Sequence, residues 1–228
     1  MDAIILAGGF GTRLQKKVPN VPKPLAPIND VPFLDILLKK ISAIKQIKKI
    51  VLAIGYKADL IVERYKNSGY SFSIEDKPLG TGGALKKSIH YTSSPDLLVF
   101  NGDTYVDFSF SGVYEFHKTS GSAVTIIAEE IPNTSRFGTL ELDPKTKRIL
   151  QFKEKLGIPQ KGTINCGVYL IKRDLFSENS YPEVFSLEND AFPKLLKKGM
   201  YAFPSSGNFI DIGTEESYEE AQWSLTTS

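Results

Sequence analysis

The chain has 228 residues, of which 41% are hydrophobic and 24% charged, a composition typical of a soluble globular protein. Its 28 basic and 26 acidic side chains leave a formal net charge of +2, so we expect neither nucleic acid nor an anionic membrane as a partner. A single cysteine, Cys166, excludes an intrachain disulfide, and the absence of a secretion signal at the N-terminus predicts a cytoplasmic protein.

The first half of the chain alternates short apolar runs with helical patterns. We expect strands at residues 2–6, 49–54, 70–75 and 96–100, and helices at 33–44, 58–66 and 83–91. Strands separated by helices of this length predict right-handed βαβ crossovers and a mostly parallel sheet. Ligands of such sheets bind at the carboxyl ends of the strands.

The second half has a different pattern, with four predicted strands joined by short turns. They cover residues 123–130, 137–142, 148–153 and 163–172, and are followed by a helix at 191–198, a short strand ending near Ile212 and a helix at 214–225. The whole pattern predicts one α/β domain over residues 1–228. Its sheet would be Rossmann-like, mostly parallel and mixed, flanked by helices, with a small antiparallel extension. We expect nucleotide binding in about residues 1–110 and second-substrate binding in about 111–228.

A glycine-rich loop, LAGGFGTRL, follows the first predicted strand. Glycine lets backbone N–H groups approach an anion closely, so the loop is a candidate phosphate site. Its candidate residues are Leu6, Ala7, Gly8, Gly9, Gly11, Thr12 and Arg13. The spacing fits neither a P-loop, which needs a lysine after its second conserved glycine, nor the dinucleotide fingerprint, which needs a small residue at Leu14. An ordinary glycine-rich turn is the alternative.

Eight residues after this loop the chain reads PKPLAPI, and prolines on both sides of Lys23 restrict its backbone. LAGGFGTRL followed by PKPL resembles the signature of the sugar-1-phosphate nucleotidylyltransferases. The resemblance implies a GT-A-like nucleotidyltransferase fold and transfer of a nucleotidyl group to a sugar 1-phosphate. It implies Arg13 and Lys23 as catalytic residues that bind the triphosphate.

A second glycine-rich turn, EDKPLGTGGAL, begins at Glu75 and resembles the base-binding segment of this family. The resemblance assigns Pro78, Gly80 and Thr81 to the nucleotide site. A carboxylate offers only acceptors, and guanine presents two neighbouring donors, N1–H and N2–H₂, so Glu75 favours GTP over UTP or dTTP. The alternative is that Glu75 is a solvated acid at the end of a strand.

Two aspartates follow predicted strands, Asp103 in FNGDT and Asp211 in FIDIGTEESY. In the family resemblance they jointly bind a divalent cation, with Gly102 removing side-chain bulk beside Asp103, which also contacts both substrates. Two carboxylates with phosphate oxygens and water suit Mg²⁺. Asp211 could instead cap the helix that follows it.

Sugar-phosphate residues are also implied by the resemblance, in the segments RFGTLELD, FKEK and INCGVYLI. They are Gly138, Glu154, Lys155 and Asn165, although Leu156 replaces the proline of the family's usual EKP. The segment SLENDAFP also resembles the family, and a purely structural role is open for it. Both histidines, His90 and His117, are interpreted as surface or core residues.

The resemblance implies the reaction of a sugar 1-phosphate with an NTP to give an NDP-sugar and pyrophosphate, with Mg²⁺ as cofactor. Within the family, the segments are most similar to those of enzymes that use GTP and D-glycero-α-D-manno-heptose 1-phosphate for surface glycans. Mannose-1-phosphate guanylyltransferase and a hexose or N-acetylmuramate 1-phosphate uridylyltransferase are alternatives, as are a molybdopterin guanylyltransferase and a non-catalytic nucleotide-sugar sensor. The sequence leaves monomer and homo-oligomer open.

Overall fold

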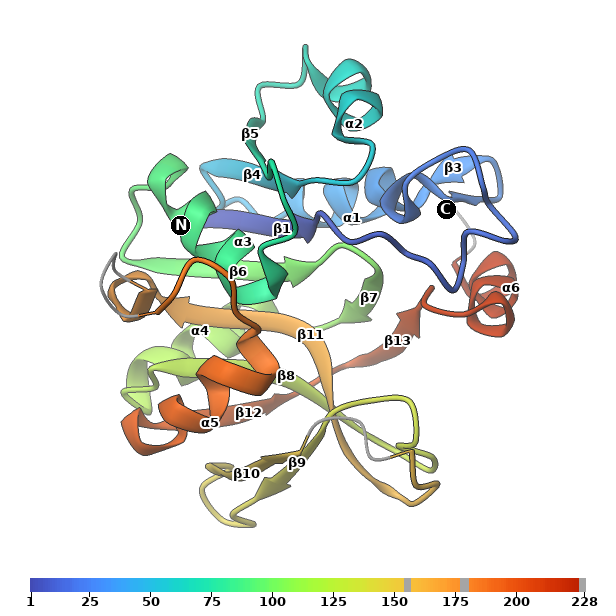
Figure 1. Cartoon of the computed structure of the whole chain (residues 1–228). Coiled ribbons are helices and arrows are strands. Elements are labelled where there is room, and N and C mark those ends of the chain that lie inside the picture. Colours follow the sequence, from blue (N-terminus) through green and yellow to red (C-terminus); the bar gives the residue numbers. More distant parts are fainter. Residues whose placement is uncertain (154–156, 177–180, 226–228) are drawn as a thin grey trace.

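The computed structural model describes residues 1–153, 157–176 and 181–225 (Figure 1). Within these residues the main feature is a nine-stranded sheet, in which seven strands follow the order β10-β9-β11-β6-β1-β4-β5 and β8 pairs with both β11 and β12. The strands are β1 (Asp2–Ala7), β4 (Lys49–Ile54), β5 (Ser71–Ile74), β6 (Asp96–Asn101), β8 (Val124–Ile131), β9 (Thr139–Leu142), β10 (Ile149–Lys153), β11 (Gly162–Lys172) and β12 (Met200–Pro204).

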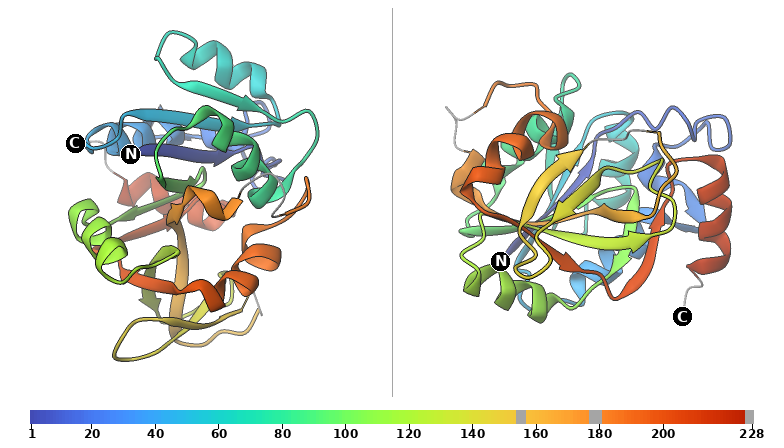
Figure 2. Two further views of the ribbon diagram at one scale, coloured as in Figure 1. Left: turned by 90° about the vertical axis from the view of Figure 1, so that its left-hand side faces the viewer. Right: turned by 90° about the horizontal axis from the view of Figure 1, so that it is seen from below.

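Strands β5, β4, β1 and β6 are parallel, and β11 runs antiparallel to β6, β8 and β9. Helices cover both faces of this sheet (Figures 1 and 2). They are α1 (Phe33–Ser42), α2 (Ala58–Tyr65), α3 (Gly80–Ser88), α4 (Phe110–Thr119) and α5 (Phe192–Leu195), whereas α6 (Glu215–Ser224) packs beside the sheet. This arrangement confirms the predicted mostly parallel mixed sheet with helices on its faces.

Alternate residues of β1 face opposite sides of the sheet, as the pleat requires. Ile4 packs into a core with residues of α3 and α5, whereas Ile5 packs with residues of α1, α2 and α4. All of β1 from Ala3 to Ile5 is fully buried, which explains why its sequence is a continuous apolar run.

Two small antiparallel sheets lie beside the main one, β2 (Pro27–Ile28) with β3 (Val31–Pro32), and β7 (Thr104–Asp107) with β13 (Gly207–Asp211). A third apolar core joins α6 and β13 to the hairpin β2–β3 and to the outer side of α1. There the Tyr218 hydroxyl donates a hydrogen bond to the Pro27 carbonyl oxygen. The segment near the C-terminus therefore packs against residues near the N-terminus.

The sequence prediction missed some elements of the fold. Helix α4 and strands β7 and β12 were not predicted, whereas the expected short strand ending near Ile212 is β13, which lies in a different sheet from β12. Helix α4 contains a glycine, two β-branched residues and several aromatic residues, so its propensity signal is weak. Burial of Val113 and His117, four residues apart, and the Ser109 side chain, which accepts a hydrogen bond from the Gly112 N–H, stabilise it instead.

Helix α3 begins at Gly80, three residues before the predicted start, although glycines are poor helix formers. A Cβ atom on Gly82 would lie 2.2 Å from the Phe185 ring, so close packing requires glycine there. No helix in the described parts of the chain combines the length and the apolar character needed to cross a membrane.

His117 is a buried residue of α4, and its Nδ1 atom lies 2.8 Å from Thr125 Oγ1. Burial lowers the pKa of His117 from 6.5 to about 4. The Asp96 carboxylate, 3.8 Å away, has the opposite and smaller effect on this pKa. The unfolded chain therefore binds a proton at a higher pH than the folded chain, and stability falls as the pH drops from 6.5 towards 4.

We expect His117→Gln to reduce this acid sensitivity. Between about pH 6.5 and pH 5 the unfolding free energy of the unchanged chain should fall by about 2 kcal/mol more than that of the variant, from one proton at about 1.4 kcal/mol per pH unit. Urea unfolding at both pH values measures the difference, with the exposed His90→Gln as control. Equal pH dependence in the two variants would show that His117 does not contribute.

Candidate active site

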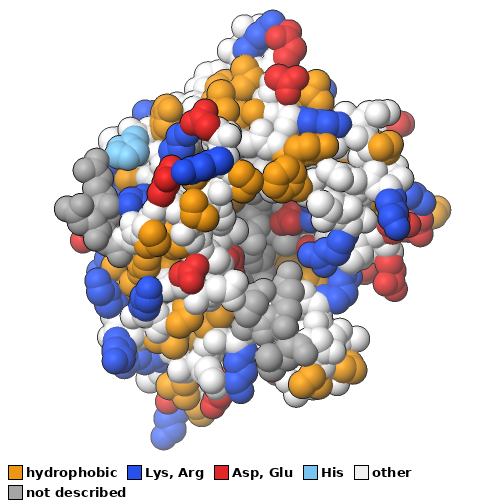
Figure 3. Space-filling view, in the orientation of Figure 1, with side chains coloured by type: hydrophobic (Ala, Val, Ile, Leu, Met, Phe, Trp, Pro, Cys, Tyr) orange, Lys and Arg blue, Asp and Glu red, His pale blue; other side chains and the backbone are white. Residues whose placement is uncertain are grey.

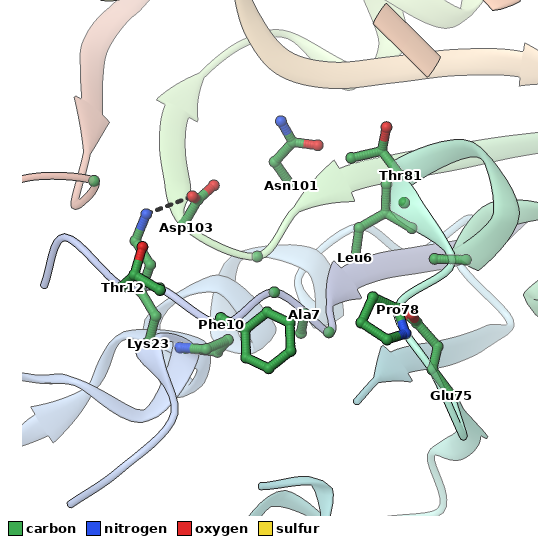
Figure 4. A pocket seen from close by; sticks show the side chains of 18 of the residues that line it. Leu6, Ala7, Phe10, Thr12, Lys23, Glu75, Pro78, Thr81, Asn101 and Asp103 are labelled. Atoms are coloured by element: carbon green, nitrogen blue, oxygen red, sulfur yellow. Dashed lines mark hydrogen bonds and ion pairs between the residues drawn. The ribbon is translucent and has the colours of Figure 1, made fainter. Parts of the chain in front are cut away.

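A cavity of about 390 Å³ lies at the carboxyl ends of β1 and β6, which pair in parallel with Leu6 opposite Asn101 (Figure 4). In the space-filling view, acidic and basic side chains surround a hollow near the middle of this side of the molecule (Figure 3). All fourteen residues predicted to bind nucleotide line the cavity. They are Leu6, Ala7, Gly8, Gly9, Gly11, Thr12, Arg13, Lys23, Glu75, Pro78, Gly80, Thr81, Gly102 and Asp103.

The glycine-rich loop is in contact with two other predicted site residues. A Cβ atom on Gly8 would lie 2.4 Å from Glu75 Oε1, and one on Gly11 would lie 2.7 Å from Lys23 Cβ. Gly11 also has a φ of +61°, a conformation that favours glycine. These two glycines therefore allow Glu75 and Lys23 to pack directly against the loop.

Lys23 begins a short 3₁₀ helix, Lys23–Leu25, in which Pro24 and Leu25 are buried. Burial of its neighbours leaves only 11% of the Lys23 side chain exposed. Its Nζ atom lies 2.5 Å from Asp103 Oδ2, an ion pair drawn in Figure 4. The structure thus brings together the two predicted residues that are 80 positions apart in the chain.

Glu75 follows β5 directly, and its backbone N–H donates to the Ile54 carbonyl oxygen of β4. Its Oε2 atom accepts a hydrogen bond from the Leu79 N–H at 3.0 Å, so the side chain points back toward the cavity beside Pro78 (Figure 4). Burial raises the pKa of Glu75, and the Leu79 N–H and the Lys87 charge oppose that effect. Glu75 is therefore a half-buried carboxylate in the wall of the cavity. This differs from the alternative interpretation, in which it is a solvated acid at the end of a strand.

The ribbon formed by β7 and β13 brings Asp103 and Asp211 together. Asp211 is paired with Thr104, the residue after Asp103, and the Ile212 N–H donates to the Asp103 carbonyl oxygen at 3.0 Å. Burial, and next the negative charge of Asp103, raise the pKa of Asp211, while Lys23 and Arg136 lower it. Two carboxylates close enough to repel each other fit a divalent cation, which would relieve the repulsion.

Protein ligands for such a cation would be few. Among the residues that the structure describes, no three His, Cys, Asp or Glu side chains lie close enough together to hold a metal ion. A metal on Asp103 and Asp211 would therefore need further oxygen ligands from substrate phosphates and water, as Mg²⁺ commonly has in phosphoryl-transfer sites.

Arg136 is a site residue that the sequence interpretation missed. Its Nη2 atom donates to Asp211 Oδ1 at 2.6 Å and to Ser217 Oγ at 3.0 Å. The only signal in the sequence was its position two residues before Gly138 in the segment RFGTLELD. A lone arginine in a turn does not indicate an ion pair with a residue 75 positions later.

The predicted sugar residues are described only in part, because Glu154 and Lys155 lie outside the described residues. Gly138 and Asn165 lie together, since the Asn165 N–H donates to the Gly138 carbonyl oxygen at 3.0 Å. The Asn165 side-chain amide donates to the Tyr169 hydroxyl at 2.9 Å. Tyr169 is fully buried in β11, so this contact fixes the orientation of Asn165.

Glu188 connects this group to the cavity wall. It lies in the one-turn π-helix Leu187–Ala191, in the segment SLENDAFP, and its Oε2 atom accepts hydrogen bonds from Thr81 Oγ1 at 2.7 Å and Ser186 Oγ at 2.9 Å. Its Oε1 atom lies 3.4 Å from the Tyr169 hydroxyl. The cavity is also lined by five residues that lie within the same sequence motifs but were not assigned to the nucleotide site, namely Phe10, Pro24, Ala84, Asn101 and Gly213.

Comparison with known proteins places the chain in a family. Residues 2–228 match the nucleotidyl transferase family, and the chain belongs to it. The resemblance found in the sequence is thereby confirmed, and the protein is a nucleotidyltransferase by family. Nucleotidyltransferases of this kind generally use a divalent metal ion.

Its relatives include D-glycero-α-D-manno-heptose 1-phosphate guanylyltransferase of Aneurinibacillus thermoaerophilus, which is 37% identical over 99% of this chain and 98% of the relative. The enzyme of the same name from Campylobacter jejuni is 36% identical over 96% of this chain and 97% of the relative. Among solved structures, HddC from Yersinia pseudotuberculosis is 34% identical with a TM-score of 0.86 and covers 99% of both chains, and HddC has also been solved in complex with GMP-PN.

We expect Gly8→Ala to lower the unfolding free energy by about 1–3 kcal/mol, because the added methyl group overlaps Glu75 Oε1. Gly9→Ala is the matched control, since nothing lies within 4 Å of a Cβ atom at that position. Urea unfolding of both variants, and of Gly8→Ala combined with Glu75→Ala, measures the coupling. Adding Glu75→Ala should remove most of the loss in unfolding free energy caused by Gly8→Ala. Equal unfolding free energies of Gly8→Ala and Gly9→Ala would contradict the packing of Gly8 against Glu75.

Proposed function

We propose that the protein transfers a guanylyl group from GTP to D-glycero-α-D-manno-heptose 1-phosphate, giving the GDP-heptose and pyrophosphate. The main observation behind the proposal is that one cavity is lined by the glycine-rich loop, Lys23, Glu75 and Asp103. Relatives named for this reaction, similar to the chain over nearly its full length, support the choice of both substrates.

In this reaction a phosphate oxygen of the sugar 1-phosphate attacks the α-phosphorus of GTP. A new P–O–P bond forms, and the bond from the α-phosphorus to the oxygen bridging to the β-phosphate breaks. Its electron pair leaves with pyrophosphate. Because the attacking oxygen is already anionic, no general base is required, and the protein contributes alignment and neutralisation of charge.

Each basic residue assigned to the site has a role in this proposal. Arg13 and the loop N–H groups would bind the β- and γ-phosphates, which depart as pyrophosphate. Lys23 would turn from Asp103 to the α-phosphate, where negative charge develops. Lys155, outside the described residues, would orient the sugar phosphate.

Asp103 and Asp211 would hold Mg²⁺, and the ion would supply neutralisation of the phosphate charge. Asp103 would also lie against both substrates. The pairing of Asp211 with Thr104 and the hydrogen bond from the Ile212 N–H to the Asp103 carbonyl oxygen bring the two residues together and support this assignment.

The sugar would bind on the side of β9 and β11. Glu154 and Asn165 would accept hydrogen bonds from its hydroxyl groups, and the backbone at Gly138 would permit close approach. We propose that Glu188 extends this group, since it links Thr81 of the cavity wall to Tyr169 beside Asn165. The nucleotide would thus be bound by about residues 1–110 and the sugar phosphate by about residues 111–228 of one domain.

The test is pyrophosphate release with Mg²⁺ for GTP, UTP, CTP, dTTP and ATP, each paired with heptose, mannose, glucose and N-acetylmuramate 1-phosphates. We expect release with GTP and heptose 1-phosphate alone. Release with mannose 1-phosphate instead would transfer the assignment to the longer mannose relatives, which this chain matches at 31% identity over 62% of the relative's length. No release with any pair, together with GDP-sugar binding in calorimetry, would identify a sensor.

We expect Lys23→Ala to lower kcat/KM more than a hundredfold. This corresponds to a loss of about 3 kcal/mol of transition-state stabilisation, as for removal of one electrostatic group at a reacting centre. Asp103→Ala should cost a similar amount. Steady-state pyrophosphate release measures both, and Lys16→Ala, an exposed lysine outside the cavity, is the control. Near-normal turnover by the first two variants would refute the assignment.

We expect Glu75→Gln to weaken the preference for GTP by about 1–3 kcal/mol, since an amide NH₂ would face a guanine donor. The ratio of kcat/KM for GTP to that for UTP measures this preference. Asp76→Asn is the control, because that neighbouring side chain is 94% exposed. An unchanged ratio in Glu75→Gln would show that another group reads the base.

A further inference from the structure

Each of the two carboxylates proposed to bind metal is already paired with a cation of the chain itself. Lys23 Nζ lies 2.5 Å from Asp103 Oδ2, and Arg136 Nη2 lies 2.6 Å from Asp211 Oδ1. The four side chains come from four separate segments, and their formal charges sum to zero. A divalent cation that enters this group is attracted by two carboxylates and repelled by two cations.

Lys23 has a clear alternative partner in the proposed reaction, the α-phosphate of GTP. Arg136 has no role in that reaction, yet it is fixed at Asp211. Its Nη2 atom also donates to Ser217 Oγ at 3.0 Å, and its guanidinium lies 5.4 Å from the centre of the Phe137 ring. The Phe137 ring contacts Phe209, which lies in β13 two residues before Asp211.

The carboxylate of this ion pair is the more buried partner. Only 18% of the Asp211 side chain is exposed, against 35% of the Arg136 side chain, so water screens the charge of the carboxylate weakly. Arg136 Nε is buried without a hydrogen-bond partner among the described residues, and a buried, unpaired donor is costly. Such a cost is retained where the guanidinium position itself matters.

We propose that Arg136 is a built-in counter-cation of Asp211 that competes with a divalent metal ion for this carboxylate. The competition makes metal binding to the nucleotide-free protein weak, and it makes tight metal binding depend on the phosphates that the nucleotide brings. The proposal rests on the proposed function only in taking Asp103 and Asp211 as the metal-binding pair.

The test measures metal binding directly, in the full-length protein without nucleotide or sugar. Mn²⁺ replaces Mg²⁺, and the free Mn²⁺ signal in electron paramagnetic resonance gives the dissociation constant. We expect Arg136→Gln to bind Mn²⁺ about tenfold or more tightly than the unchanged chain, because it loses a positive charge in contact with the carboxylate. Arg136→Lys keeps the charge and should remain weak.

Two controls define the result. Arg64→Gln removes an arginine that pairs with another aspartate, Asp35, outside the cavity, and should leave the affinity unchanged. Asp211→Asn combined with Arg136→Gln should abolish the gain. Equal or weaker Mn²⁺ binding by Arg136→Gln would overturn the proposal, as would a gain that persists without the Asp211 carboxylate.

A second measurement keeps the proposal testable if Arg136→Gln does not fold. In the unchanged chain, the ¹⁵Nε–¹H signal of Arg136, assigned by its loss in Arg136→Lys, is followed during titration with Mg²⁺. We expect the signal to shift and to saturate with the same dissociation constant as metal binding. A signal that stays in place while the metal binds would refute the competition. None of these readouts requires turnover, so they can fail or succeed independently of the substrate panel.

Discussion

β1 and β6 pair in parallel, with Leu6 opposite Asn101, so the chain leaves both strands at the same edge of the sheet. The glycine-rich loop follows one strand and Asp103 follows the other, and the two segments line one cavity. β4 and β5 extend the same parallel arrangement and bring Glu75 to that edge. The positions of the loop, of Asp103 and of Glu75 therefore depend on one pattern of backbone hydrogen bonds.

The two aspartates at this site, Asp103 and Asp211, each have a basic partner. Lys23 pairs with Asp103 and Arg136 with Asp211, and the proposed reaction would bring several further negative charges in the substrates. Both cations thus have protein partners without a substrate, and in the proposed reaction only Lys23 would exchange its carboxylate for a phosphate oxygen. Such pairing limits the cost of burying charge in the site without a ligand.

Much of this architecture could be predicted from local sequence. Continuous apolar runs such as β1, and helices with regular apolar spacing such as α1, are determined by burial and are visible in the sequence. Helix α4 was not predicted because packing of Val113 and His117 stabilises it more than its propensity does. Tertiary packing also explains the early start of α3 at Gly80, against the low helix propensity of glycine.

The residues of the candidate site also differ in how far local sequence predicts them. Glycine-rich loops and acids that follow strands carry a local signal, and this is why all the predicted nucleotide residues line one cavity. Arg136 carries no such signal, and the segment of Glu188 was noted only as similar to the family, because their contacts depend on partners 75 and 107 positions away in the chain. Only the folded chain shows that the Arg136 turn meets the end of β13.

The ribbon of β7 and β13 has a consequence for the order in which the site can form. During synthesis the glycine-rich loop, Lys23 and Asp103 are all made more than a hundred residues before Asp211, and Tyr218 must then reach back 191 positions to Pro27. Contacts of such high sequence separation form slowly. The side of the site formed by the glycine-rich loop, Lys23 and Asp103 can therefore fold first, and the second carboxylate is added only when the last strand and helix pack against the beginning of the chain.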